Sequence, residues 1–231
     1  DSLPVADGRR RVVNVASALK VLIVEGQRGL RPMEGSAACL ALARAPPRDP
    51  SASDPLSQTA SYVEPELISD LELGNRILAD YRAVILAGVG QIQPSQADQL
   101  RHFVEQGGLL MLFMGEPVSG ENYNSVLLPR GLLPGPMVKR VSVTGEQESI
   151  HFDFVPTADI HPMLREFGNE QKSGLDTARI FSYWQVDLAP DARAERVLNF
   201  QPTGTDDSVR HDPAVPIHAL GEGHVIFVAT A

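Results

Sequence analysis

The sequence has one cysteine, Cys39, among its 231 residues. An internal disulfide is therefore excluded, and the lone thiol says nothing about the redox compartment. Cys39 falls in a stretch rich in Ala and Leu, where a cysteine usually behaves as a small buried apolar residue. Long apolar runs are missing as well. The run GGLLMLFMG at residues 107–115 is too short for a membrane helix, which needs about 18 apolar residues or more.

Basic residues are fewer than acidic residues in this sequence. The chain carries 20 Lys and Arg against 29 Asp and Glu, which gives a formal net charge of -9. Binding to a phosphate backbone depends on clustered Lys and Arg, so this balance argues against a nucleic-acid partner. The only dense positive run, Arg9 to Arg11, is assigned to a solvated strand edge.

The opening residues, DSLPVADG, lack an initiator Met and the basic start and apolar middle of a signal peptide. We therefore expect the sequence to be a piece of a longer protein. Its apolar fraction of 43% is enough for a core of normal size in one large domain.

Continuous apolar runs predict three strands buried on both faces of a parallel sheet. These runs are Val21 to Val24, Ala83 to Ala87 and Leu109 to Met114. The weaker run SYVEPEL contains Pro65, which favours an edge strand or an early end of the strand.

Helices are expected between these strands, at Met33 to Ala45 and at residues 94–106. The second helix begins at Pro94 and ends before Gly107 and Gly108. Its apolar stripe comprises Ala97, Leu100, Phe103 and Val104. Strand, helix and strand with short connections are typical of right-handed crossovers, and three such strands imply a doubly wound sheet.

After residue 140 the pattern changes to short strand-like runs separated by turns. The segment LGEGH at residues 220–224 indicates a hairpin, and Val225 to Val228 is apolar enough to return to the central sheet. The best helix candidate of this half is IHPMLREFG, residues 160–168.

Ligands of open α/β sheets bind outside the carboxyl ends of the strands, where the strand order reverses. The predicted strands bring Glu25, Gly26, Gly88, Gly115 and Glu116 to that edge. Two carboxylates there can hold Mg²⁺ or share a proton, but the accompanying Asp, Lys and Thr of phosphate chemistry are missing. Each carboxylate is therefore expected to cap a helix or to accept loop amides. No metal site and no cofactor are predicted.

Acyl transfer needs a Ser or Cys on a tight turn, a His as base and an acid that orients it. The turn after the third strand has neither Ser nor Cys, and Ser119 lies several residues further on. None of the six histidines has zinc-site spacing, and His161, which precedes a helix, has no acid at a plausible offset. ENYNSVLLP at residues 121–129 predicts a short helix with Tyr123 packed beneath the loop. No catalytic residue is predicted.

The segments KVLIVEG (20–26), 81–124 and LGEGHVIFVATA (220–231) together resemble the class I glutamine amidotransferase-like domain of bacterial membrane-anchored BatA-type proteins. Such proteins are similar to aerotolerance regulators and carry membrane helices and a von Willebrand factor A-like domain. The resemblance covers most of residues 12–230. It implies an α/β, flavodoxin-like, mainly parallel sheet with helices on both faces, extended by antiparallel strands in the C-terminal half. Residues 1–18 would be a terminal strand or linker from a preceding β domain, and residues 19–231 the amidotransferase-like domain.

The sequence departs from that family at the reacting groups. Class I amidotransferases carry a Gly-x-Cys-x-Gly elbow where this chain reads Phe113-Met114-Gly115-Glu116. The best counterpart of their later His-x-Glu, which begins at His161, lacks the Glu. The resemblance therefore implies the family's scaffold without its chemistry.

We therefore expect a non-catalytic module that binds a ligand or another protein, within a larger membrane-anchored protein exposed in the periplasm. The partners implied are other domains of the same chain and von Willebrand factor A-type proteins, with membrane contact only through segments outside this sequence. The candidate ligand-binding residues are Glu25, Gly26, Gly88, Gly115, Glu116, Asn122 and Tyr123.

Two alternatives stay open. One is a hydrolase or transferase with a relocated site formed by Glu116, His161 and Ser119. The other is a sensor of a carbohydrate or another small molecule, in which hydrogen bonds and stacking come from Glu25, Glu116, Asn122 and Tyr123.

Overall fold

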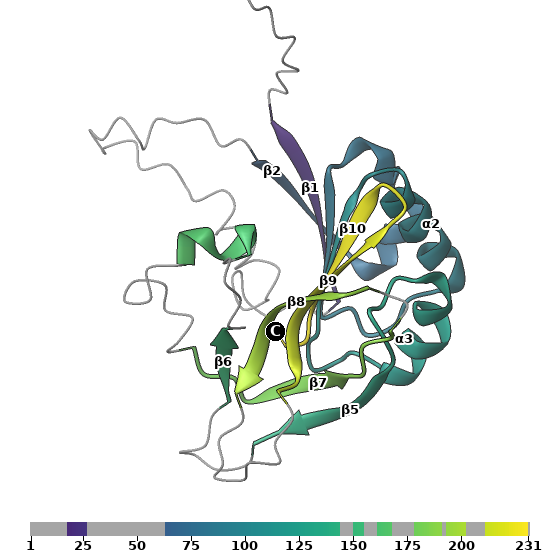
Figure 1. Ribbon diagram of the computed structural model, residues 1–231. Helices are drawn as coiled ribbons and strands as arrows, with labels where there is room; N and C mark the ends of the chain where they lie inside the picture. The colour runs from purple at the N-terminus through teal and green to yellow at the C-terminus, as the bar shows by residue number, and fades with distance from the viewer. Residues whose placement is uncertain are drawn as a thin grey trace, which may run out of the picture.

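A computed structural model describes residues 18–26, 63–143, 150–154, 161–167, 178–190, 193–201 and 211–230. Its centre is an eight-stranded sheet with the strand order β2-β1-β3-β4-β10-β9-β8-β6. The strands from β2 to β10 in this order are parallel, and those from β10 to β6 are antiparallel to their neighbours. The predicted α/β class is confirmed, with a large, mostly parallel sheet that antiparallel C-terminal strands extend (Figure 1).

The first half of the chain supplies four of the parallel strands. They are β1 (Leu19–Glu25), β2 (Val63–Ser69), β3 (Ala83–Ala87) and β4 (Leu109–Phe113). All three predicted buried strands are confirmed, and β4 ends one residue before the predicted Met114. Strand β2 is at the edge of the sheet and has one neighbouring strand. The missing N–H of Pro65 therefore deprives no second strand of a hydrogen bond.

The helix predicted after the second buried strand is confirmed as α2 (Pro94–Glu105). Gln93 precedes it and forms a capping box with Gln96, whose side chain accepts a hydrogen bond from the Gln93 N–H at 2.9 Å. Gly107, with a φ of 95°, follows its last turn. The predicted stripe is buried in full: Ala97, Leu100, Phe103 and Val104. None of the helices in the described ranges is both long and apolar enough to cross a membrane.

Two short 3-10 segments connect β2 to β3, where the residue pattern predicts no helix. They are η2 (Asp70–Asn75) and η3 (Leu78–Asp80), and both contact α2. Each is anchored by one buried leucine, Leu73 or Leu78, which is too little apolar surface for a longer amphipathic helix. The predicted helix at Met33 to Ala45, which contains Cys39, lies outside the described residues.

The hairpin predicted in the C-terminal half is confirmed. Strands β9 (Pro213–Leu220) and β10 (Gly223–Val228) are antiparallel and joined through Gly221, whose φ is 60°. β10 returns to the central sheet beside β4, as its apolar run predicts. Outside this hairpin the sheet continues through β8 (Glu195–Gln201) to β6 (His151–Phe154).

Strands β5 (Met137–Ser142) and β7 (Ser182–Val186) form a separate two-stranded ribbon. The Trp184 N–H of β7 donates to the Ala229 carbonyl at 2.8 Å, just beyond the end of β10. The ribbon therefore crosses the sheet at the carboxyl ends of its parallel strands, as Figure 1 shows. Helix α3 (Gly120–Val126) lies on the same side of the sheet as α2 and contacts β5.

The helix predicted at residues 160–168 needs a correction. The structure has the 3-10 segment η5 (Pro162–Phe167) there. Its first bond joins the Leu164 N–H to the His161 carbonyl at 2.8 Å, which is the tighter i to i+3 pattern. Pro162 has no N–H to extend a bonded turn toward the preceding residues.

His218 on β9 is one of the few polar side chains buried in the described part of the chain, with 5% exposed. Its Nε2 lies 2.8 Å from the Gly131 carbonyl and so carries the proton that this bond needs. Nδ1 is buried and has no hydrogen-bond partner among the described residues. Burial lowers the pKa of His218, and His224 adds to this effect, while the bond to Gly131 opposes it.

This environment predicts a pH-dependent stability. The unfolded chain binds the proton of His218 at a higher pH than the folded chain does, so the free energy of unfolding should fall as the pH falls below about 6.5. One proton contributes a slope of at most about 1.4 kcal/mol per pH unit. Urea denaturation of wild type and His218→Gln between pH 8 and pH 5.5 measures it. The free energy of unfolding should depend less steeply on pH in His218→Gln than in wild type. Equal slopes would contradict the assignment of this dependence to His218. His102 is exposed, so His102→Gln serves as the control.

Candidate functional site

The carboxyl ends of β1, β3, β4 and β10 lie together at one edge of the sheet. The first residue beyond each strand bonds to the neighbouring strand end: the N–H of Gly26 donates to the Ala87 carbonyl at 3.1 Å, and that of Gly88 to the Phe113 carbonyl at 3.0 Å. The chain leaves β1 toward β2 on one side, while β3 lies on the other, so the strand order reverses at β1. Open α/β sheets generally bind ligands at this edge.

Glu25, the last residue of β1, is the polar side chain buried at this point. Only 7% of the residue is exposed. Its Oε1 atom is fully buried and has no hydrogen-bond partner among the described residues. A buried polar atom without a partner costs about 1 to 3 kcal/mol, and more for a charged group. A ligand that donates an N–H or O–H to Glu25 would remove that penalty.

The backbone around Glu25 is packed too closely for side chains. A Cβ at Gly26 would overlap the carbonyl of Gly88 and the Cα of Val89. Gly88 has a φ of 58°, and a Cβ there would lie 3.7 Å from the Cα of Gly115. Three of the predicted site residues, Gly26, Gly88 and Gly115, therefore follow β1, β3 and β4 where the backbones pack against one another.

Glu116 occupies a different environment from Glu25. Its side chain is 84% exposed and lies 3.7 Å from the guanidinium of Arg140 on β5. Glu25 ends β1 and Glu116 follows β4. These strands are not neighbours, because β3 lies between them and adjacent strands are spaced about 4.8 Å apart. Glu116 is thus paired with a cation in solvent, while Glu25 is buried. Among the described residues no group of three or more His, Cys, Asp and Glu is arranged to hold a metal ion.

Asn122 and Tyr123 hold the loop that follows β3. The Tyr123 hydroxyl is fully buried and donates to the Val89 carbonyl at 2.7 Å, and burial raises its pKa. The Asn122 side chain accepts from the Ile92 N–H at 2.8 Å and donates to the Ile92 carbonyl at 3.2 Å. Tyr123 lies beneath the loop, as predicted. Both side chains therefore position the backbone of the site, and a direct contact with a ligand stays a prediction.

The residues of the relocated-enzyme alternative have separate partners. The Ser119 hydroxyl accepts from the Asn122 N–H at 3.3 Å as the N-cap of α3. His161 lies 3.7 Å from Glu195, and its Nδ1 accepts from the Met163 N–H at 3.3 Å. No hydrogen bond or ion pair joins Ser119, His161 and Glu116 among the described residues.

Sequence reasoning missed the ribbon that lies over this edge. Arg140 comes from β5, and Trp184 from β7 packs against Gly120 at the start of α3. A Cβ at Gly120 would lie 2.8 Å from the Trp184 ring, so the close packing depends on glycine. The alternating run SYWQV indicates a strand, but its pairing with a strand more than forty residues earlier is not visible in the sequence.

No family model matches this chain, and no curated protein matches it either. Solved structures do match. A cytoplasmic protein from Salmonella typhimurium is 16% identical with a TM-score of 0.59, over 92% of this chain and 87% of that one. A putative ThuA-like protein from Bacteroides uniformis is 14% identical with a TM-score of 0.56, over 96% and 86%. The chain has a flavodoxin-like, ThuA-like fold.

The same fold occurs inside larger enzymes. A beta-galactosidase from Rahnella sp. R3 is 15% identical with a TM-score of 0.53, and the match covers 92% of this chain but 29% of the enzyme. Identities this low show a shared fold and carry no activity from one protein to another.

Proposed function

We propose that this chain is a non-catalytic module that binds a small molecule at the carboxyl edge of an amidotransferase-like fold. The observation that carries the proposal is the buried Oε1 of Glu25, which has no partner among the described residues where the strand order reverses. Gly26 allows the end of β1 to pack closely against the backbone after β3, and Glu25 would select a ligand with a hydroxyl, amide or ammonium donor. Sugars and polyols meet this requirement, in agreement with the sensor alternative.

The surroundings of the turn after β4 support a role without catalysis. Gly115 and Glu116 stand where an amidotransferase has its nucleophile, and Glu116 is paired with Arg140. The nearest hydroxyl along the chain, that of Ser119, caps α3. A nucleophile needs a base within hydrogen-bond reach, and Ser119 has none among the described residues.

The proposal includes a protein context. From the resemblance to BatA-type proteins we propose that the module belongs to a membrane-anchored bacterial protein, is exposed in the periplasm, and meets other domains of its chain or von Willebrand factor A-type proteins. We also propose that helices cover both faces of the sheet. The step from β1 to β2 runs in the opposite direction to that from β3 to β4, and right-handed connections place such helices on opposite faces.

Glu25→Met tests the binding site even while the ligand is unidentified. Methionine is apolar and close in volume, so it removes an unpartnered carboxylate and should raise the free energy of unfolding by about 1 kcal/mol. A thermal-shift screen of sugars, polyols and amines at millimolar concentration should find compounds that stabilise wild type and leave Glu25→Met unchanged. Urea denaturation measures the first effect.

Glu64→Met on the exposed edge strand β2 is the matched control, with an expected change within about 0.5 kcal/mol. Marked destabilisation by Glu25→Met would show that the carboxylate already has a partner in the native protein. Equal stabilisation of wild type and Glu25→Met by every active compound would place binding elsewhere. Either result would refute the proposal.

A further inference from the structure

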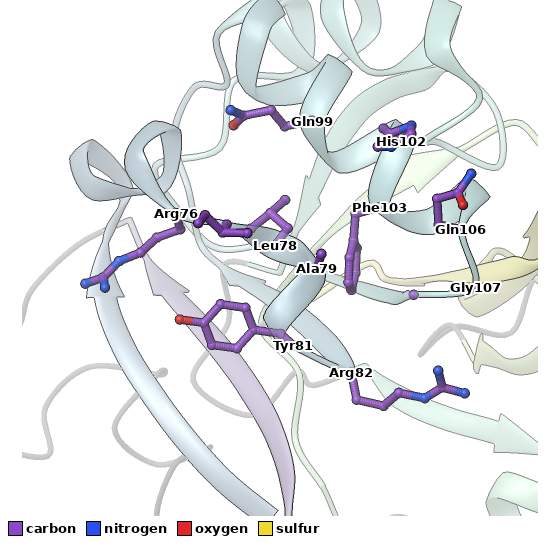
Figure 2. Close-up of a pocket in the computed structure, with 12 residues that line it drawn as sticks. Arg76, Leu78, Ala79, Tyr81, Arg82, Gln99, His102, Phe103, Gln106 and Gly107 are labelled. Carbon is purple, nitrogen blue, oxygen red and sulfur yellow. The ribbon is translucent and has the colours of Figure 1, made fainter.

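A hollow lies at the opposite edge of the sheet from Glu25, at the amino ends of β3 and β4. It is a cavity of about 500 Å³ between η3 and the second half of α2. Figure 2 shows Phe103 in its centre, with Leu78 and Ala79 on one side and Arg82 below. This volume is within the range of pockets that hold small molecules, about 300 to 1,000 Å³.

The floor of the cavity is apolar and fixed. Leu78 is 6% exposed and Phe103 is 7% exposed. The Phe103 ring lies directly on Gly108, where a Cβ would overlap the ring atoms. Ile77, which is 70% exposed, adds apolar surface at the rim. A ligand with an apolar body would remove the exposed surface of Ile77 from water.

The charge of the lining contrasts with that of the chain. The net charge of the protein is -9, but the residues that line the cavity include Arg76, Arg82 and His102 and neither Asp nor Glu. Arg76 is already neutralised, because it lies 3.0 Å from Glu66 and 3.9 Å from Glu72. Arg82 has no acidic partner among the described residues, and its backbone is fixed between β1 and β4.

The carboxyl end of α2, which also borders the cavity, does not oppose an anion as strongly as a bare helix end would. Its last carbonyl groups all accept backbone N–H donors and are therefore not directed at a ligand. The bonds are Gln106 to His102 at 3.1 Å, Gly108 to Phe103 at 3.0 Å, Gly107 to Val104 at 2.9 Å and Glu222 to Glu105 at 3.1 Å.

We infer that this cavity binds a small organic acid. The carboxylate pairs with the guanidinium of Arg82, whose planar donors match the two oxygens of a carboxylate. The apolar body of the acid lies on Phe103 and Leu78. One unpaired cation fits one negative charge, which favours a monocarboxylate over a phosphate dianion. This site is independent of the proposed one at Glu25, which lies at the carboxyl end of β1, on the opposite edge of the sheet.

Titration with phenylacetate, followed by amide NMR shifts, tests the inference on the intact chain. We expect saturable shifts at Ala79, Phe103, Gly107 and Gly108, and none with the uncharged phenylacetamide at equal concentration. Arg82→Gln should weaken phenylacetate binding at least about tenfold, because a charge-assisted pair is lost. Ala79→Trp, at an exposed position that lines the cavity, should abolish binding by filling it.

Arg101→Gln is the control for Arg82→Gln, because Arg101 is on α2, pairs with Glu105 and does not line the cavity. Its affinity for phenylacetate should equal that of wild type. The inference is overturned if phenylacetate causes no saturable shifts, if phenylacetamide binds equally well, or if Arg82→Gln retains full affinity. Glu25→Met should leave this titration unchanged, so failure here and failure of the proposed function are separate results.

Discussion

Gly26→Ala should lower the free energy of unfolding by about 3 kcal/mol. A Cβ at Gly26 would overlap the Gly88 carbonyl and the Val89 Cα, and both obstacles are backbone atoms that cannot rotate away. Relief requires β1 and β3 to move apart at their carboxyl ends, which breaks the bond from the Gly26 N–H to the Ala87 carbonyl. Urea denaturation, with the midpoint and slope compared to wild type, measures the loss.

Gly74→Ala is the matched control for this substitution. A Cβ at Gly74 meets only the Gln96 side chain, at 4.0 Å, which is ordinary contact. Alanine there should be neutral or should stabilise the protein by up to about 1 kcal/mol, because it restricts the unfolded chain. Equal stability of Gly26→Ala and wild type would show that the ends of β1 and β3 are further apart than the structure has them.

Tyr123→Ala should cost about 4 kcal/mol, the range for removing a large buried aromatic side chain. The ring is fully buried beneath the loop after β3, and its hydroxyl is the donor to the Val89 carbonyl. Tyr123→Phe separates the two contributions. It keeps the ring, leaves one buried carbonyl without this donor, and should cost about 1 to 2 kcal/mol.

Tyr81→Phe is the control for the hydroxyl. The Tyr81 hydroxyl donates to Glu66 at 2.6 Å, but the pair is only partly buried, and the loss should be smaller than for Tyr123→Phe. Because Tyr123 and Val89 adjoin the proposed binding edge, Tyr123→Phe should also weaken the binding of any ligand whose binding Glu25→Met reduces. Tyr123→Ala with wild-type stability would mean that this side chain is not buried in solution.

Much of the fold could be predicted from the sequence because burial leaves a local pattern. The runs Val21 to Val24, Ala83 to Ala87 and Leu109 to Met114 are apolar at every position, and the structure places them in the middle of the sheet, with Leu109 and Phe113 half-buried and the others buried. The stripe of α2 is equally local, since residues three and four apart share a helix face. The short η2 and η3 carry too few periodic positions to be predicted.

The candidate site was predictable in part. The strand ends place Glu25, Gly26 and Gly88 at one edge as soon as the sheet is known to be parallel. Nothing local distinguishes Glu25 from Glu116, yet one is buried without a partner among the described residues and the other pairs with Arg140 in solvent. That difference depends on the position of β5, which is set by contacts between distant segments.

Local residue patterns were enough to identify the buried strands, the helix α2 and the hairpin of β9 and β10, because each depends on residues close together in the chain. Contacts between distant segments were needed to show that Glu25 is enclosed, that Tyr123 and Asn122 hold a loop, and that Arg82 and Phe103 share a cavity at the far edge. Burial and pairing of this kind depend on which distant strands become neighbours, and no local pattern encodes that choice.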